Sequence, residues 1–424
     1  MVYMFKKLKQ FDYLTFSTTD SYLKYRIFCQ GKHGLIYRVT SYFYNFIKSF
    51  NLFRFKVKKS DVIFIYSTEN QKKSLDLIQE RYKEKHGESC GVSYSLKNKL
   101  KSNYYFPEVY SYLVSLIFFP VAIIESLYSI FFKKDYDKYA HGIDRYILSF
   151  GQYITYWLFL SFIKPKIIML SNDHNSEIRV VLSIAKKKGI KTIYVQHASP
   201  NSQLPPLEQF DKSLLDGQAS LDVYDTIGKL SEDVELVGIS KLDKVKRAKK
   251  GAYSREFVSI AINASFEMPN LISLIKGINT LGEVVRLRLH PGQMGNQNSI
   301  KKQLNGLDVV FNDPTKDDLF DFILTSKSLI AGNSNILLEA ALLNIPTYYA
   351  RLDNSEFDYY GFVKNKISVE IKQDLSNITQ VFNINEVSNK QGLKYYDNSV
   401  GESYFGYSNE LICDHIDDLL NKCN

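Results

Sequence analysis

The most constraining feature of the chain is a repeated alternation of short runs rich in β-branched residues with longer helical stretches. Such alternation is typical of parallel α/β layers, in which a helix connects each strand to the next. A first series is predicted to contain strands at 61–68, 166–172 and 191–196, with helices at 71–85 and 176–188. A second series is predicted to contain strands at 257–263, 284–289, 308–311, 328–332 and 346–350, with helices from Pro269, after Pro314 and over 336–344.

The length of 424 residues is too great for one ordinary core, and usual domain sizes favour two or three domains. We therefore predict an α/β fold of two facing Rossmann-like domains with a cleft between them. The boundary is expected within the polar, basic region 232–252. The predicted domains cover 1–235 and 236–400, and the segment 401–424 is predicted to form a closing helix.

The composition is that of a globular protein, because 45% hydrophobic and 23% charged residues exclude a disordered chain. The net charge of +9 is unevenly distributed. Residues 1–100 hold 19 Lys and Arg against 8 Asp and Glu, or +11, whereas the other 324 residues hold 35 against 37, or −2. The first hundred residues contain no RNA-binding motif, and their lysines alternate with Phe and Tyr. This pattern favours an anionic membrane surface over nucleic acid.

The four cysteines have no CxxC spacing, which argues against a zinc site and against a disulfide framework, so no metal site is predicted. The start of the chain, MVYMFKKLKQF, lacks the continuous apolar run and the cleavage site of a secretory signal. We therefore expect a cytoplasmic protein, bound peripherally at the inner face of the cytoplasmic membrane.

Two apolar stretches raise the question of membrane contact, because a spanning helix needs about 20 apolar residues. The stretch 146–163 leads directly into a predicted strand and is predicted to be a core helix. The stretch 109–132 contains Pro120 and many aromatic residues, and Lys133 and Lys134 follow it. It is the better candidate for an interfacial or re-entrant element.

Polar residues just beyond the strands are the candidates for a site, because ligands of open parallel sheets bind at the carboxyl ends of the strands. One such loop follows the strand 328–332. It consists of Gly332, Asn333, Ser334 and Asn335. Gly332 allows a tight turn, Ser334 or Asn333 is placed to cap the next helix, and the free N–H groups of that helix suit a phosphate. Glu339 is placed to accept hydrogen bonds from a ribose; the alternative is a capped core helix with Glu339 facing solvent.

A second candidate follows the strand 284–289. His290 is held in an extended backbone by Pro291, and an imidazole at a strand end can donate a hydrogen bond to a phosphate. Arg288, two residues earlier, is a further candidate for the nucleotide. The alternative for His290 is a structural role.

Three residues of the first series are candidates for catalysis. Asp173 and His197 follow the strands 166–172 and 191–196, where each is placed to take a proton from an acceptor hydroxyl. The alternative for Asp173 is a cap or turn residue of the helix 176–188, whose ends are marked by a serine N-cap and Gly189. Glu177, in the first turn of that helix, is either a complement to the helix dipole or a third catalytic residue.

The segments LRLHPGQ (287–293) and AGNSNILLEAALLNIPTYY (331–349), with the preceding stretch 167–199 and VGISKLD (237–243), resemble bacterial GT-B glycosyltransferases of surface-polysaccharide synthesis. The His-Pro motif and the serine loop look most like enzymes that use CMP-activated ulosonic acids, the sialyl- and Kdo-transferases. The resemblance covers roughly residues 165–350. It implies that His290 and Ser334 contact the nucleotide phosphate, and that Asp173 or His197 acts as base or nucleophile.

The sequence departs from this family in having Asn335 where a second serine is frequent and Asn344 where a glycine commonly ends the helix. The resemblance implies a metal-independent glycosyltransferase of capsule or lipopolysaccharide synthesis. Its partners would be a nucleotide-sugar donor, which is a substrate and not a cofactor, and a glycan or lipid-linked glycan acceptor. The nucleotide would be bound by the C-terminal domain and the acceptor by the N-terminal domain.

Three alternatives are kept. One is a CDP-glycerol or CDP-ribitol phosphotransferase, or a nucleotide-sugar epimerase, on the same scaffold. The second is a non-catalytic membrane scaffold of a polysaccharide assembly complex. The third, binding of RNA through residues 1–100, is weaker because no RNA-binding motif is present.

Overall fold

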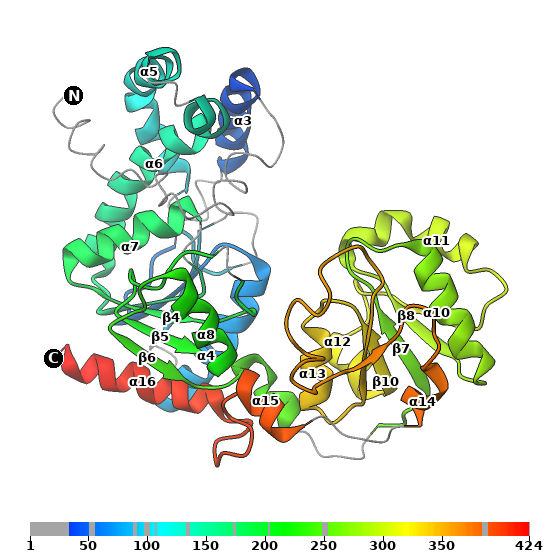
Figure 1. The fold of residues 1–424 in the computed structure, drawn as a ribbon. Coiled ribbons are helices and arrows are strands. Elements are labelled where there is room, and N and C mark those ends of the chain that lie inside the picture. Colours follow the sequence, from blue (N-terminus) through cyan, green and yellow to red (C-terminus); the bar gives the residue numbers. More distant parts are fainter. Residues whose placement is uncertain are drawn as a thin grey trace. The chain divides into compact units, whose positions relative to one another are not determined.

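The structure, a computed structural model, describes residues 34–50, 56–87, 91–96, 102–106, 108–132, 136–172, 175–201, 204–247, 253–383 and 389–423. The chain divides into two compact units (Figure 1). The first unit is Met1–Lys241 with Tyr407–Asn424, and the second unit is Leu242–Gly406. The division falls within the region 232–252, and the last segment of the chain belongs to the first unit.

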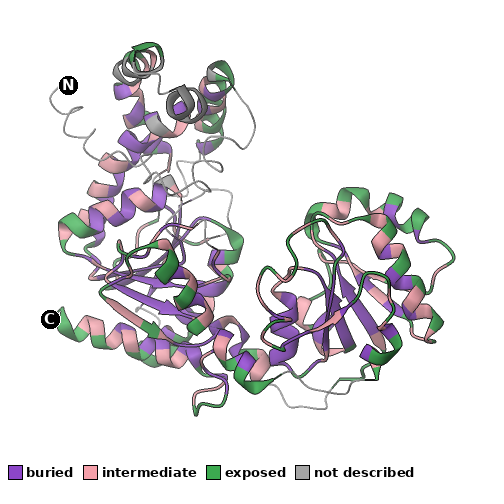
Figure 2. Cartoon of the chain, in the orientation of Figure 1, coloured by how far each residue is buried: buried purple, intermediate pink, exposed green. Residues whose placement is uncertain are grey.

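The first unit is built on a six-stranded sheet in the order β2-β1-β3-β4-β5-β6, with every neighbouring pair parallel. Its strands are β1 Val62–Tyr66, β2 Val92–Ser95, β3 Ile167–Leu170, β4 Lys191–Val195, β5 Lys212–Leu215 and β6 Asp233–Leu236. The first five strands are almost wholly buried, which fits a parallel sheet covered on both faces (Figure 2).

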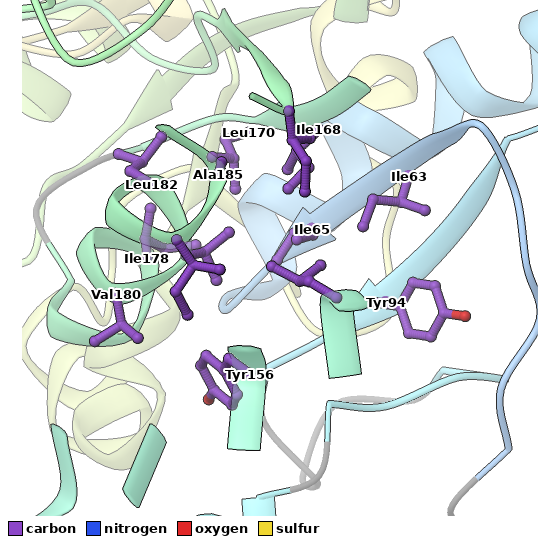
Figure 3. Close-up of a cluster of buried hydrophobic side chains, with 14 of the residues drawn as sticks. Ile63, Ile65, Tyr94, Tyr156, Ile168, Leu170, Ile178, Val180, Leu182 and Ala185 are labelled. Atoms are coloured by element: carbon purple, nitrogen blue, oxygen red, sulfur yellow. The ribbon is translucent and has the colours of Figure 1, made fainter. Parts of the chain in front are cut away.

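Helices cover both faces of this sheet. They are α4 Glu69–His86, α6 Tyr136–Ile163, α7 Ser176–Lys188, α8 Gln218–Ile227 and α16 Ser408–Lys422. One apolar cluster joins the sheet to α6 and α7 and includes Ile65, Tyr156 and Ile178 (Figure 3). A second cluster, on the other face, joins the sheet to α4 and α16. Gly189 ends α7 in the left-handed conformation with φ 66°, as predicted, whereas the N-cap is Asn175 and not the predicted serine.

The first unit also carries a helical bundle, defined here as α3 Leu35–Ser49, α5 Glu108–Phe132 and the first part of α6. The bundle has a core of its own, which includes Tyr42, Tyr112 and Ile147. A Cβ at Gly151 would lie 1.8 Å from the Ser111 carbonyl oxygen, so α5 and α6 approach each other closely there. Pro120 lies inside α5, which continues through it as one 25-residue helix, and membrane contact of 109–132 stays a prediction.

One helical stretch, Ile143–Ile163 within α6, is long and apolar enough to cross a membrane by length and composition, and 59% of it is buried in the protein. Its last turns pack on the first sheet through Phe159, Leu160 and Ile163. This part of α6 is the core helix predicted for 146–163.

The second unit is built on another parallel six-stranded sheet, in the order β12-β11-β10-β7-β8-β9. Its strands are β7 Phe257–Ala261, β8 Val285–Arg288, β9 Val309–Asn312, β10 Ser326–Ala331, β11 Thr347–Ala350 and β12 Val369–Ile371. Its helices include α10 Met268–Thr280, α11 Gln297–Gln303, α12 Leu319–Leu324, α13 Ile336–Leu342, α14 Ile378–Phe382 and α15 Lys390–Tyr396. Residues of α10, α11 and α14 share one apolar cluster with the sheet.

Two local predictions for this unit are corrected. The helix predicted after Pro314 begins only at Leu319, because Asp318 is its N-cap and accepts hydrogen bonds from the N–H groups of Phe320 and Asp321. The helix after the Gly332 loop is α13, and its N-cap is Asn335, whose side chain makes no capping hydrogen bond. Ser334 and Asn333 therefore do not cap it. Asn344 adopts φ 58° beyond the end of α13, as predicted.

Candidate functional site

The order of the strands shows where each sheet is best suited to hold a ligand. In a doubly wound sheet the ligand lies at the carboxyl edge, where the strand order reverses direction. In the second unit the order reverses between β7 and β10, and in the first unit it reverses between β1 and β3. The two candidate regions are therefore the carboxyl edge of the second sheet, beside Asn263 and Gly332, and the carboxyl edge of the first sheet, beside Ser67 and Ser171.

The carboxyl edge of the second sheet is held by hydrogen bonds between its loops. Asn263, just after β7, donates from Nδ2 to the Asn333 carbonyl oxygen at 3.2 Å. The Asn333 side chain in turn bonds the loop after β11, donating to Ser355 Oγ at 2.8 Å and to the Glu356 carbonyl at 2.6 Å, and accepting from the Tyr359 N–H at 2.9 Å. All three bonds lie within the protein, so the structure places Asn333 as the residue that fixes the loop.

His290 lies at the same edge, two residues after β8, the strand next to β7. Its backbone is extended, with φ −64° and ψ 141°, as the following Pro291 requires. Nδ1 accepts a hydrogen bond from the Gly292 N–H at 3.0 Å, and the side chain is exposed. Because Nδ1 is the acceptor, the proton of the neutral ring is assigned to Nε2. His290 thus presents a fixed, exposed N–H donor about two strand spacings, roughly 10 Å, from the Gly332 loop.

Arg288 is placed differently from His290. Its Nη1 donates to Asn312 Oδ1 and to the Asp317 carbonyl at 3.2 Å, on the side of β9. Its guanidinium also lies 5.6 Å from the centre of the Phe322 ring. The structure therefore does not bring the Arg288 guanidinium toward the Gly332 loop.

Gly332, Ser334, Asn335 and Glu339 all lie at the carboxyl end of β10. A Cβ at Gly332 would stand 3.4 Å from the Ala350 carbonyl oxygen, an ordinary van der Waals contact, so packing there does not require a glycine. Glu339 is 7% exposed, which contradicts the alternative in which it faces solvent. α13 has only seven residues and is buried throughout.

The carboxyl edge of the first sheet holds a linked set of polar side chains between β1 and β3. Asn175 donates from Nδ2 to Ser67 Oγ at 2.6 Å, and Gln71 Oε1 accepts from the Ser67 N–H at 2.9 Å. Beside them, Ser171 is 1% exposed and Asn172 is 2% exposed. Ser171 Oγ and both polar atoms of the Asn172 amide have no hydrogen-bond partner among the described residues.

A buried polar group without a hydrogen bond lowers the stability of the fold by about 1–3 kcal/mol, because it loses its bonds to water and gains none. Folded proteins keep few of them, and each one calls for an explanation such as a bound water or ligand. Ser171 and Asn172 are therefore candidates for hydrogen bonds to a substrate.

His197 follows β4, the neighbour of β3. Burial lowers the pKa of its imidazole to about 4; a hydrogen bond with the Ser171 backbone opposes this shift, and the Lys241 ammonium adds to it. Nδ1 is buried and finds no partner in the described part of the chain. The ring is therefore neutral near pH 7 and adds one more unfilled hydrogen-bonding atom beside Ser171.

Glu177 lies in the first turn of α7 and is 7% exposed. Its charge is felt by the buried Tyr156 hydroxyl, whose pKa is raised well above that of free tyrosine, mainly by burial and further by Glu177. Glu177 is therefore inside the protein and in the first turn of α7, where a carboxylate complements the helix dipole. Asp173 lies outside the described residues.

Sequence reasoning missed Ser67, Gln71, Asn172 and Asn263 as parts of these edges. Ser67 and Asn263 directly follow strands, so the rule applied to the other loops would have found them. Asn172 was passed over in favour of its neighbour Asp173. What singles it out is burial without a partner, and that depends on which strands lie side by side.

Two cavities lie at the opposite, amino edges of the sheets. One, of about 310 Å³, is lined by Arg255, Leu343, Lys390 and Phe405 among others in the second unit. The other, of about 460 Å³, is lined by Asp61, His86 and Asp417 in the first unit. We place the candidate site at the carboxyl edges, because the strand order reverses and the loops converge there. Among the described residues, no cluster of three or more His, Cys, Asp or Glu is arranged to hold a metal ion.

No protein-family model matches the chain, and no curated protein matches it in sequence. Its fold is similar to solved structures. The S. aureus MnaA–UDP co-structure has a TM-score of 0.56 at 12% identity, over 86% of this chain and 97% of that one. A putative UDP-N-acetylglucosamine 2-epimerase from Listeria monocytogenes gives 0.57 at 11% identity, over 86% and 98%. UDP-GlcNAc 2-epimerase from Neisseria meningitidis bound to UDP-GlcNAc gives 0.55 at 11% identity, over 85% and 99%.

At these identities the likeness shows the fold alone. Together with the two parallel sheets, it confirms the predicted GT-B type of architecture with two Rossmann-like units. The predicted cleft between the units stays a prediction.

Proposed function

We propose that the protein processes a nucleotide sugar, and that it transfers the sugar to a glycan acceptor. The observation that carries this proposal is the carboxyl edge of the second sheet. There the strand order reverses beside Gly332, and the exposed His290 follows β8, two strands away. The carboxyl edge at such a reversal is where doubly wound sheets bind nucleotides. In support, the proteins named above were solved with UDP or UDP-GlcNAc, or are described as UDP-GlcNAc epimerases.

His290 is proposed to donate from Nε2 to the phosphate that leaves with the nucleotide. Its bond from the Gly292 N–H holds the ring in one orientation, so no reorientation is needed as negative charge develops. Gly332 and Ser334 would line the phosphate, and Asn333 would hold their loop in place. The buried Glu339 is proposed to accept hydrogen bonds from the ribose.

The acceptor hydroxyl is proposed to bind at the carboxyl edge of the first sheet. Ser171 Oγ, the Asn172 amide and His197 Nδ1 offer unfilled donors and acceptors for a sugar hydroxyl. A neutral histidine of low pKa is a hydrogen-bond acceptor at pH 7 but a weak base. Deprotonation of the hydroxyl is therefore assigned to Asp173 or Glu177, with His197 orienting the acceptor.

Two observations bear on the identity of the donor, and they favour different nucleotides. The His290-Pro291 motif and the Ser334 loop resemble enzymes of CMP-activated ulosonic acids, whereas the structural neighbours were solved with UDP compounds. We propose a CMP-ulosonic acid as donor, with a UDP-sugar as the competing choice. A nucleotide-sugar 2-epimerase is the second candidate function, favoured because the fold covers 97–99% of the epimerase-like chains.

The test separates these functions by their need for an acceptor. Purified protein is incubated with CMP-, CDP- or UDP-linked donors, with and without a glycan acceptor, and free nucleotide and sugar products are separated by chromatography. A transferase releases nucleotide only when acceptor is present, and the nucleotide released identifies the donor. An epimerase converts the UDP-sugar without acceptor. If calorimetry detects no saturable nucleotide binding at all, the proposal fails and a non-catalytic scaffold is supported.

A further inference from the structure

The helical bundle of the first unit exposes an apolar surface that a water-soluble helix normally buries. Along α5 the exposed large side chains recur every three or four residues. Among the described side chains of α5 they are Tyr110, Leu113, Ile117, Ile124, Tyr128 and Phe131, with Pro120 between them and the exposed Phe132 beside the last. Ile117, Ile124 and Phe131 are 55%, 68% and 73% exposed. This spacing forms one stripe along the helix, about 30 Å long.

Exposed apolar side chains are also found on α3, where Ile36 and Ile47 are 82% and 71% exposed. Isolated exposed apolar residues are normal, but a stripe of them along a helix marks an interaction site. We call the α5 stripe with Ile36 and Ile47 of α3 the apolar face of the bundle.

The interior of the bundle combines its apolar core with hydroxyl groups that bond across the helices. The side of α5 that faces the other helices carries Ser111 and Ser115. Ser111 Oγ bonds Thr155 Oγ1 of α6 at 2.7 Å, and Ser115 Oγ bonds the Tyr42 hydroxyl of α3 at 2.5 Å. α5 therefore carries apolar side chains on its outer side as well as in the bundle core, and its small hydroxyl residues face inward.

An exposed apolar stripe is not expected of a surface helix in water, whose outer face is polar. Small residues and hydroxyl side chains that bond across helices are instead typical of packing in a lipid environment.

Three lysines of the first unit lie beside aromatic rings. Lys59 Nζ lies 4.8 Å from the centre of the Phe162 ring, and Lys188 Nζ lies 4.0 Å from that of Trp157. On α3, Lys48 Nζ lies 4.3 Å from the Tyr44 ring. Long basic side chains and aromatic rings together are characteristic of the level of lipid headgroups.

We infer that the apolar face of the bundle inserts into the apolar layer of an anionic membrane leaflet, while Lys48, Lys59 and Lys188 bind lipid phosphates. The +11 charge of residues 1–100 adds a long-range attraction to such a leaflet. The last turns of α6 belong to the core of the first sheet. Only the bundle is therefore inferred to enter the membrane, and the sheet stays in water. This inference does not depend on the proposed reaction, because membrane binding needs no nucleotide.

The test is flotation of the full chain with two kinds of vesicle, pure phosphatidylcholine and phosphatidylcholine mixed with phosphatidylglycerol. The double variant Ile117→Ser, Ile124→Ser should bind mixed vesicles at least about tenfold more weakly than the parent protein. The matched control Val284→Ser, Val310→Ser changes two exposed residues of the second unit and should bind as the parent does. Far-ultraviolet circular dichroism shows that each variant is folded.

A charge variant tests the choice of lipid. Lys59→Gln with Lys188→Gln should weaken binding to mixed vesicles by about fivefold for each lysine, and should change binding to pure phosphatidylcholine little. Absence of parent binding to either vesicle overturns the inference, as does equal binding by the isoleucine variant. A dimer in vesicle-free buffer that the isoleucine variant converts to monomer, without vesicle binding, also overturns it and makes a second copy the occupant.

Discussion

At the carboxyl edge of the second sheet, the Asn333 amide makes three hydrogen bonds within the protein. At the carboxyl edge of the first sheet, the Asn172 amide is more deeply buried and makes none with the described residues. The loops of the second edge are therefore fixed by bonds within the protein, whereas the first edge holds polar groups that have no partner among the described residues. This difference agrees with the proposed phosphate site on one unit and the proposed acceptor site on the other.

The largest effect is expected at His290. The variant His290→Ala should lower kcat/KM for sugar transfer about 10²- to 10³-fold, because it removes a preorganised donor to the leaving phosphate. Steady-state kinetics measure the change. In the control His290→Asp the carboxylate can still accept from the Gly292 N–H, so the turn is kept but the donor is lost. If His290→Asp retains most of the activity, the second edge does not bind the phosphate through this residue.

The closed network of the second edge should make Asn333 important for stability. Asn333→Ala removes three hydrogen bonds and should lower the free energy of unfolding of the second unit by about 2–3 kcal/mol. Urea denaturation measures this. Asn333→Asp keeps the acceptor for the Tyr359 N–H but loses the donors. Its free energy of unfolding should lie between those of the parent protein and of Asn333→Ala. A loss below about 0.5 kcal/mol for Asn333→Ala would show that the network is not what fixes the loop.

The pH dependence of stability should show that His197, at the carboxyl edge of the first sheet, is shielded from water. Its pKa is about 4 in the folded protein and near 6.5 in the unfolded chain, so between these values only the unfolded chain takes up the proton. Stability is therefore lost as the pH falls below 6.5. Near pH 5 this amounts to about 2 kcal/mol.

In the variant His197→Gln this contribution is absent. Urea unfolding near neutral pH and near pH 5 should show a smaller acid loss for the variant than for the parent. His415, whose pKa burial also lowers, is unchanged in both proteins and cancels from the difference. Parallel pH profiles would mean that His197 is solvated, and the first edge would then be less closed to water than its burial indicates.

The smallest effect is expected at Asn172, where the sign of the change in the free energy of unfolding is informative. Asn172→Leu replaces a buried amide without described partners by an apolar side chain, and should raise the free energy of unfolding by about 1 kcal/mol while lowering activity. Asn263→Leu, at the corresponding place in the second sheet, removes a formed hydrogen bond and should destabilise by a similar amount. Thermal unfolding compares the two. If both variants are destabilised, the two carboxyl edges do not differ in the way described above.

The sequence was informative where a signal is local. The strands β1, β3, β4 and β7 to β11, the helix stop at Gly189 and the left-handed Asn344 all follow from short patterns. Strand order is not a local property, so the reversal between β1 and β3 and the resulting importance of Asn172 were not predicted. The predicted N-caps of α7 and α13 were wrong by one or two residues, because several neighbouring polar residues are equally suited to the position. The inward-facing hydroxyls of α5 were missed because they depend on where α3 and α6 pack.

The last helix, α16, has a consequence for how the protein folds during synthesis. Its residues Ile412, Cys413 and Ile416 complete the apolar cluster that also contains Val62 and Ile167. The whole second unit, Leu242–Gly406, is thus inserted between two parts of the first. A growing chain cannot close the core of its first unit until the ribosome has finished the second, so that face of the sheet stays open throughout translation of the insertion. Such exposed surface is what chaperones bind and what drives aggregation of incomplete chains.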